Sequence, residues 1–217
     1  MVNSIIKLHT ENHIGFENFL KHELPECITV LNRGGILVFP TETLYGLGVD
    51  ITNECAIDRL IELKGRPRNM PIAVAVTDLK QVIPLAEITE LATKIIKNCL
   101  PKPITILLTA KKTINPRLLG GSDLIGFRFP EHPVTTAIIN HFGPITATSA
   151  NLHNCPEPIT IDNAIEQFGD RVDIYLDSGP CRFAKPSTVI NTINDTIKII
   201  RYGACSGTEL EECLRGN

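Results

Sequence analysis

The chain has 217 residues, of which 43% are hydrophobic, and this is enough to bury the core of one α/β domain. Its 21 basic and 24 acidic residues give a net charge of -3, which excludes a broad positive field that would attract nucleic acid or anionic membranes. No apolar run approaches the length that spans a bilayer. We therefore expect a single cytoplasmic domain over residues 1–217, which binds any anion through a local cluster of cations.

Strand-like and helix-like patterns alternate along the chain, and this favours an α/β fold with a mixed or mostly parallel sheet. The apolar run at residues 36–39 predicts a buried strand, which Pro40 ends. Apolar positions at helical spacing then predict a helix that Thr52 or Asn53 caps and that Gly65 ends.

Apolar runs predict further strands at residues 72–76, 104–108, 124–129 and 145–148. A helix is expected from Thr160 to Gly169, and a hairpin from the segments 187–191 and 196–201. A short peripheral helix is expected after Cys205. The seven cysteines lack a C-x-x-C pair, and their odd number predicts small, half-buried thiols in a reducing compartment.

The first polar stretch comes directly after the strand at residues 36–39. Thr41 and Thr43 place hydroxyls at the end of this strand, where open α/β sheets tend to bind ligands. Gly46 and Gly48 let the backbone approach a substrate closely. The stretch is equally compatible with an ordinary loop whose threonines cap a helix.

Cations come next. Lys64 and Arg66 lie on either side of Gly65 at the end of the predicted helix, where they could clamp an anion or simply be solvated. Arg128 lies inside an aliphatic and aromatic strand, so it must reach solvent or meet a carboxylate or phosphate, and we favour an anionic ligand. His132 could support that site, although an exposed loop histidine is the simpler interpretation.

Ser149 and Asn151 follow a strand end and should point in the same direction. The G-x-S-x-G elbow of serine hydrolases is absent, so we expect Ser149 to bind a ligand by hydrogen bonds and not to act as a nucleophile. Ser187 and Arg201, at the two ends of the late hairpin, could complete a ring of donors.

These segments, taken in order, resemble the YrdC-like family, whose best-known members are threonylcarbamoyl-AMP synthases. The resemblance covers the chain from about Gly34 to Gly203. Its motifs are Pro40-Thr41-Glu42-Thr43-Leu44-Tyr45-Gly46-Leu47-Gly48, Lys64-x-Arg66-Pro67, Arg128-x-Pro130-x-His132-Pro133, Thr148-Ser149-Ala150-Asn151-Leu152, Pro186-Ser187-Thr188-Val189-Ile190 and Arg201-x-Gly203.

The resemblance implies a twisted, open mixed sheet with helices packed on it and a wide basic cavity. It also implies a nucleotidyltransferase that makes threonylcarbamoyl-adenylate and pyrophosphate from L-threonine, bicarbonate and ATP, with Mg²⁺ accompanying the ATP. The product would serve the threonylcarbamoyladenosine modification of tRNA. The expected partners are therefore tRNA and the proteins that transfer the threonylcarbamoyl group to it.

The resemblance assigns roles to eight residues. The family's ATP-handling positions correspond to Lys64, Arg66, Ser149, Asn151 and Arg201, and Lys64 and Arg66 are also the expected catalytic cations. The threonine-holding positions correspond to Thr43, Arg128 and Ser187. No residue is assigned to hold a metal.

Two other functions are compatible with such a fold. One is a carbamoyl-adenylate transferase that starts from carbamoyl phosphate. The lack of a fused acylphosphatase or zinc-finger segment in the chain argues against this function. The other is an RNA-binding module, against which the chain has no tryptophan, only three tyrosines and a net negative charge.

Overall fold

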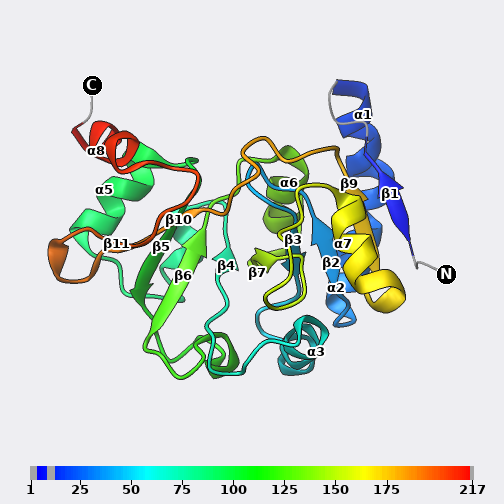
Figure 1. The fold of residues 1–217 in the computed structure, drawn as a ribbon, viewed down its shortest axis with the longest axis horizontal. Coiled ribbons are helices and arrows are strands. Elements are labelled where there is room, and N and C mark those ends of the chain that lie inside the picture. Colours follow the sequence, from blue (N-terminus) through cyan, green and yellow to red (C-terminus); the bar gives the residue numbers. More distant parts are fainter. Residues whose placement is uncertain (1–3, 9–12, 216–217) are drawn as a thin grey trace.

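The computed structural model describes residues 4–8 and 13–215. Its strands divide between two sheets, which lie side by side in Figure 1. The first sheet has the order β1-β9-β2-β3-β8, and its strands are Ile5–Lys7, Ile174–Asp177, Leu37–Phe39, Gly46–Gly48 and Thr148–Ser149. The second has the order β11-β10-β5-β6-β4-β7, and its strands are Lys198–Arg201, Thr188–Asn191, Ile104–Thr109, Leu124–Arg128, Val74–Ala75 and Ile145–Thr146.

Both sheets mix parallel and antiparallel pairs, as the sequence predicts. In the first sheet β1 and β2 pair parallel to β9, while β3 pairs antiparallel to β2 and to β8. In the second, β5 is parallel to β10 and antiparallel to β6, and β10 and β11 form the expected antiparallel pair. The expected mixed sheet is present, but the described strands form two sheets and not one.

Helices cover both sheets and bury two apolar clusters. The α-helices are α1 (His13–Asn18), α2 (Leu24–Asn32), α3 (Glu54–Lys64), α4 (Leu79–Val82), α5 (Glu90–Cys99), α6 (Pro133–Phe142), α7 (Ile161–Phe168) and α8 (Gly207–Arg215). A π-helix at Phe19–Glu23 joins α1 to α2. In the described part of the chain, every helix is too short or too polar to cross a membrane.

Helix α3 forms where local signals place it. The Asn53 side chain accepts a hydrogen bond from the Ala56 backbone N–H, and this caps the first turn. Gly65 adopts a left-handed conformation with φ of 60°, which stops the helix directly after Lys64. Both ends are therefore confirmed, and Lys64 and Arg66 leave the helix in different directions.

The segment expected as one strand at residues 145–148 is divided between the two sheets. Ile145 and Thr146 pair with β4 of the second sheet, whereas Thr148 and Ser149 pair with β3 of the first. Ala147 lies between them, and its N–H bonds the Ala73 carbonyl at 2.8 Å. The chain thus crosses from one sheet to the other at a single residue.

Thr146 fastens this crossing to the first sheet. Its buried hydroxyl accepts the Val49 N–H at 3.0 Å and donates to the Leu47 carbonyl at 3.1 Å. We expect Thr146→Val to lower the free energy of unfolding by about 1–3 kcal/mol, because it leaves the Val49 N–H buried without a partner. Urea unfolding measures this change. Thr93→Val removes only a hydroxyl that bonds the Thr89 carbonyl within α5, and a loss as large in this control would refute the explanation.

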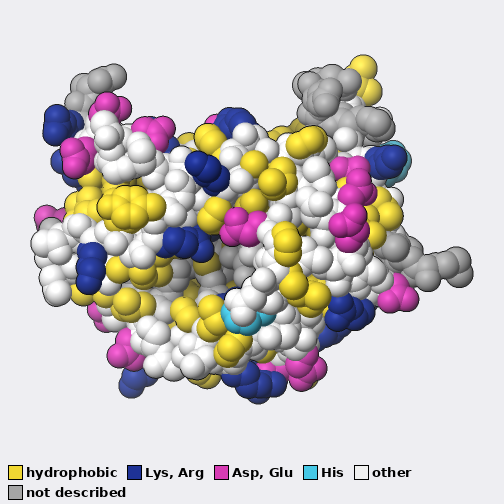
Figure 2. All heavy atoms as spheres, viewed as in Figure 1, with side chains coloured by type: hydrophobic (Ala, Val, Ile, Leu, Met, Phe, Trp, Pro, Cys, Tyr) yellow, Lys and Arg dark blue, Asp and Glu magenta, His cyan; other side chains and the backbone are white. Residues whose placement is uncertain are grey.

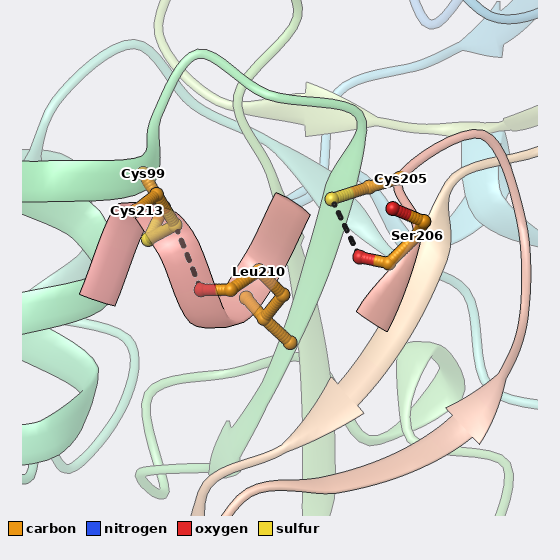
Figure 3. Close-up of a disulfide and its surroundings, with 5 residues drawn as sticks. All are labelled: Cys99, Cys205, Ser206, Leu210 and Cys213. Atoms are coloured by element: carbon orange, nitrogen blue, oxygen red, sulfur yellow. Dashed lines mark hydrogen bonds between the residues drawn. A yellow bond between two sulfur atoms is a disulfide. The ribbon is translucent and has the colours of Figure 1, made fainter. Parts of the chain in front are cut away.

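Cys99 of α5 and Cys213 of α8, at a sequence separation of 114, form a disulfide (Figure 3). The expectation that all the cysteines are thiols is wrong for this pair, because the terminal helix packs on α5 and brings the two sulfur atoms together. It is confirmed for the other five, which are Cys27, Cys55, Cys155, Cys181 and Cys205.

Candidate functional site

A cavity of about 500 Å³ lies between the two sheets. Figure 2 shows that the face of the molecule over the junction of the sheets is hollowed near its centre. Six of the eight predicted site residues line the cavity, namely Thr43, Arg66, Arg128, Ser149, Ser187 and Arg201. Lys64 and Asn151 are not among the lining residues. Three arginines and one acidic residue, Glu157, are the charged members of the lining set within the described chain, so the cavity is basic.

The threonine-rich turn between β2 and β3 forms one wall. The Thr41 hydroxyl accepts the Thr43 and Leu44 backbone N–H groups at 3.1 and 3.2 Å and donates to the Leu44 carbonyl at 2.7 Å. The Thr41 and Thr43 oxygens are 2.9 Å apart. Thr41 therefore fixes the turn, and Thr43 presents its hydroxyl to the cavity.

The glycines of this stretch serve packing within the sheet. A Cβ on Gly46 would lie 2.6 Å from Phe39 Cζ, closer than atoms can approach. Gly48 is crowded by the same ring. These glycines therefore make room for the Phe39 ring, whereas the close approach predicted for them was to a substrate; Gly46 also lines the cavity.

Arg66 supplies a cation on the side of the first sheet. Its two terminal nitrogens donate to Thr148 Oγ1 at 3.2 Å and to the Pro71 carbonyl at 3.0 Å. Its Nε is buried and has no hydrogen-bond partner among the described residues. Burial lowers the pKa of this guanidinium from its ordinary value. Arg66 is thus held at the cavity with a donor still to be satisfied.

Arg201 and Ser187 meet at the far side, as the hairpin predicted. Arg201 donates to the Ser187 carbonyl at 2.8 Å, and Ser187 Oγ lies 2.7 Å from Thr105 Oγ1. Burial lowers the pKa of Arg201, and the nearby Glu157 carboxylate opposes this shift. Thr105, a neighbour of Arg128 across the β5–β6 pair, also lines the cavity.

Arg128 is buried at the floor of the cavity and already has a carboxylate partner. It forms an ion pair with Glu42, whose exposed fraction is 4% against 5% for Arg128. Its Nη1 also donates to the Lys102 and Phe129 carbonyls, each at 3.2 Å. An arginine inside an apolar strand favours an anionic ligand as its partner, whereas the carboxylate found at Arg128 belongs to the chain itself.

Glu42 also binds the backbone around Arg128. Its other oxygen accepts the Glu131 N–H at 2.9 Å, and its own carbonyl accepts the Phe183 N–H at 2.9 Å. The pair thus joins the first turn to the strand end after β6 and to the loop at 178–186. Sequence reasoning missed the roles of Glu42 and Thr105. The available signal was an acidic residue directly after one buried strand and a basic residue inside another.

Lys64 lies beneath the Ser149–Asn151 turn. Its ammonium donates to the Ser149 and Asn151 carbonyls, the second at 2.7 Å. Ser149 Oγ donates to Asn151 Oδ1 at 2.6 Å, so these two side chains bond each other. Burial, and to a smaller extent the charge of Arg66, lower the pKa of Lys64 to about 7.

His132 is partly buried, so the interpretation as an exposed loop histidine is wrong. Its Nε2 lies 3.0 Å from Ser178 Oγ, and it lines a second, apolar cavity of about 860 Å³. Pro130 lines both cavities. Burial lowers the pKa of His132 to about 4.

This pKa predicts a loss of stability in acid. Unfolded His132 takes up a proton below about pH 6.5, whereas the folded side chain resists protonation until about pH 4. The free energy of unfolding should therefore fall as the pH drops from 6.5 to 4, by about 3 kcal/mol. Urea unfolding across this range measures the slope, which His132→Gln should flatten. The exposed His22→Gln is the control, and an equally steep curve for His132→Gln would refute the prediction.

The fold and the cavity together define an α/β protein whose two mixed sheets enclose a small site lined by cations and hydroxyls. The chain belongs to the Sua5/YciO/YrdC family, whose model, described as telomere recombination, matches residues 29–203.

Two curated proteins and two solved structures illustrate the likeness. A protein of Methanocaldococcus jannaschii named "Putative threonylcarbamoyl-AMP synthase" is 35% identical over 97% of this chain and 98% of its own length. The Bacillus subtilis threonylcarbamoyl-AMP synthase is 31% identical over 88% of this chain and 56% of its own length. The structure of Pyrococcus abyssi Sua5 with L-threonine has a TM-score of 0.89 at 29% identity, over 96% of this chain and 60% of that one. Escherichia coli YciO, with a TM-score of 0.82 at 22% identity over 97% of this chain and 100% of that one, shows the fold alone.

The chain thus spans almost all of the M. jannaschii relative. It spans just over half of the longer B. subtilis and P. abyssi proteins.

Proposed function

We propose that this chain is a nucleotidyltransferase that makes threonylcarbamoyl-adenylate from L-threonine, bicarbonate and ATP. The observation that carries the proposal is the convergence of three arginines with Thr43, Ser149 and Ser187 in one cavity. These residues come from distant segments of the chain and face one another across the two sheets. The names of the M. jannaschii and B. subtilis relatives and the threonine complex of P. abyssi Sua5 support the same assignment.

The triphosphate would bind the more exposed cations of the cavity, Arg66 and Arg201. Arg66 and Arg201 approach the cavity from different sheets, and the unsatisfied Nε of Arg66 can donate to a phosphate oxygen. Ser149 contributes a hydroxyl on the same wall as Arg66. The two guanidinium groups would neutralise the charge that moves onto pyrophosphate as it leaves.

The amino acid would bind at the floor of the cavity. Arg128 would attract its carboxylate, and Thr43 and Ser187 would bond its amine and hydroxyl. Because Glu42 already contacts Arg128, the substrate carboxylate would share the guanidinium with Glu42 or displace it. Thr105, bonded to Ser187, completes this subsite.

The reaction needs little covalent help from the protein. The threonine amine attacks bicarbonate and yields a carbamate and one water. If CO₂ is the form attacked, the amine instead loses a proton to solvent and no water is released. A carbamate oxygen then attacks the α-phosphorus of ATP in line, and the bond to pyrophosphate breaks. The cavity acts by bringing three reactants together and stabilising the phosphoryl charge.

Mg²⁺ would enter with ATP. No three His, Cys, Asp or Glu side chains of the described residues gather closely enough to hold a metal ion. Glu157 is the acidic member of the described lining set. We therefore assign no metal ligands to the chain and treat Mg-ATP as the substrate.

Pyrophosphate release from ATP tests this function. The purified chain should release pyrophosphate only when L-threonine and bicarbonate are both present. Serine and glycine should support less turnover, and carbamoyl phosphate should not replace threonine with bicarbonate. Turnover with carbamoyl phosphate alone would favour a carbamoyl-adenylate transferase. No threonine-dependent turnover, with salt-sensitive RNA retention on a filter, would favour an RNA-binding module.

The product would pass to the tRNA modification. An adenylate with a mixed anhydride is reactive, so a protein that transfers the threonylcarbamoyl group to tRNA must consume it promptly. This partner and tRNA belong to the proposal and rest on the activity.

A further inference from the structure

Lys64 is the last residue of α3, and its side chain turns away from the cavity. Gly65 redirects the chain, so that Arg66 lines the cavity while Lys64 stays beneath the Ser149–Asn151 turn. Its exposed fraction is 5%. The two cations of the Lys-x-Arg motif therefore lie on opposite sides of one loop.

The hydrogen bonds of the Lys64 ammonium are fully used. It lies within bonding distance of the Ser149 carbonyl, the Asn151 carbonyl at 2.7 Å and Asn151 Oδ1 at 3.4 Å. An ammonium has three N–H groups, and here three oxygens accept them. A phosphate would have to displace one of these acceptors to bind Lys64.

The turn above Lys64 is held as one unit. Asn151 Oδ1 accepts the Ser149 hydroxyl, and Asn151 Nδ2 donates to the Cys155 carbonyl at 2.8 Å. The His153 N–H bonds the Lys64 carbonyl at 2.8 Å, which ties the end of the turn to the end of α3. The member of this unit that lines the cavity is Ser149.

We propose that Lys64 is a positioning residue, which sets the Ser149 turn from beneath and does not contact the triphosphate. This inference rests on the proposed function, because Ser149 and Arg66 are taken to face ATP. It gives the two cations of one motif different tasks: Arg66 binds phosphate, and Lys64 holds the backbone that carries the Ser149 hydroxyl. Asn151 works in the same way, since its side chain lies within the unit.

Inorganic pyrophosphate distinguishes the two tasks, because it offers phosphate groups without the rest of ATP. Lys64→Met should raise the KM for ATP about tenfold through the displaced Ser149, yet change the pyrophosphate dissociation constant less than about threefold. Arg66→Met should weaken pyrophosphate at least tenfold. Equal losses of pyrophosphate affinity in the two variants would overturn the proposal.

A double-mutant cycle tests the route through Ser149. Adding Lys64→Met to Ser149→Ala should raise the KM for ATP by less than about threefold, because the hydroxyl that Lys64 positions is already gone. Adding Arg66→Met to Ser149→Ala should multiply the two single effects. A multiplicative result for Lys64 would mean that it acts independently of Ser149 and would contradict the proposal.

The wild-type chain provides a test that does not depend on the folding of a variant. With ¹⁵N-labelled lysine, at a pH well below 7 where Lys64 stays protonated with or without ligand, the Lys64 Nζ resonance should change little when pyrophosphate saturates the site, whereas direct contact would shift it. The wild-type controls also separate the two proposals. If the wild type neither turns over threonine nor binds pyrophosphate, the proposed function fails and the role of Lys64 fails with it. If it does both and the Lys64 resonance shifts, only the positioning role is lost.

Discussion

Replacing Glu42 by glutamine is expected to lower the free energy of unfolding by about 3–5 kcal/mol. The substitution keeps the shape of the side chain but leaves the Arg128 guanidinium buried without its opposite charge. It also weakens the acceptor for the Glu131 N–H. Urea unfolding, with the slope compared to the wild type, measures the loss.

The double variant Glu42→Gln/Arg128→Met separates loss of the charge pair from loss of packing. Removing both charges should restore part of the stability that Glu42→Gln loses, because no unpaired charge remains. The control is Glu211→Gln, whose partner Arg215 is 79% exposed, and this change should alter stability by less than about 1 kcal/mol. If Glu42→Gln unfolds like the wild type, the pair does not hold the turn to the cavity floor.

Arg66→Met is expected to lower kcat/KM for ATP by about 10²–10³, the effect of removing one preorganised donor to a developing charge. Arg66 reaches the cavity with its Nε unpaired among the described residues, so its loss removes a cation that Thr148 and Pro71 hold in place. Arg66→Lys should recover only part of the activity, because an ammonium lacks the planar fork. Initial rates of pyrophosphate release at varied ATP give the comparison.

Arg68→Met is the matched control. Arg68 lies two residues further along and pairs with Asp58 at 2.7 Å and with Glu62 at 3.8 Å on the outer surface. Its loss removes the same charge close to the same motif without touching the cavity, and should leave kcat/KM within about twofold, as expected for an exposed ion pair. Equal losses for Arg66 and Arg68 would point to a general charge effect and not to a phosphate contact.

Features with a local cause could be predicted from the sequence. Helix α3 is framed by Asn53 and Gly65, and both act through the backbone within a few residues of themselves. The antiparallel pair β10–β11 follows from two short apolar runs around one turn. The resemblance to the YrdC-like family predicts that Arg66, Arg128 and Arg201 serve one site, and all three line the cavity.

Features that depend on distant contacts could not be predicted. Nothing near residues 145–148 indicates that the strand changes sheets at Ala147, because the crossing depends on where β3 and β4 lie. The Cys99–Cys213 bridge requires α8 to dock on α5. The partner of Arg128 was sought in a ligand because Glu42 is far away in sequence, and the burial of both side chains is visible only in the fold.

The crossing at Ala147 limits how the molecule can open. Thr146 and Thr148 belong to different sheets, yet two residues of chain span at most about 7 Å, so the walls cannot separate along this seam. The hydroxyl of Thr146, which bonds the backbone of Val49 and Leu47, holds the two sheets together at the same place. Any widening that admits a nucleotide must therefore be a rotation about this seam, with the greatest travel at the remote edge formed by β11. A ligand that bridges Arg66 and Arg201 would bring the edge formed by β11 closer to Arg66.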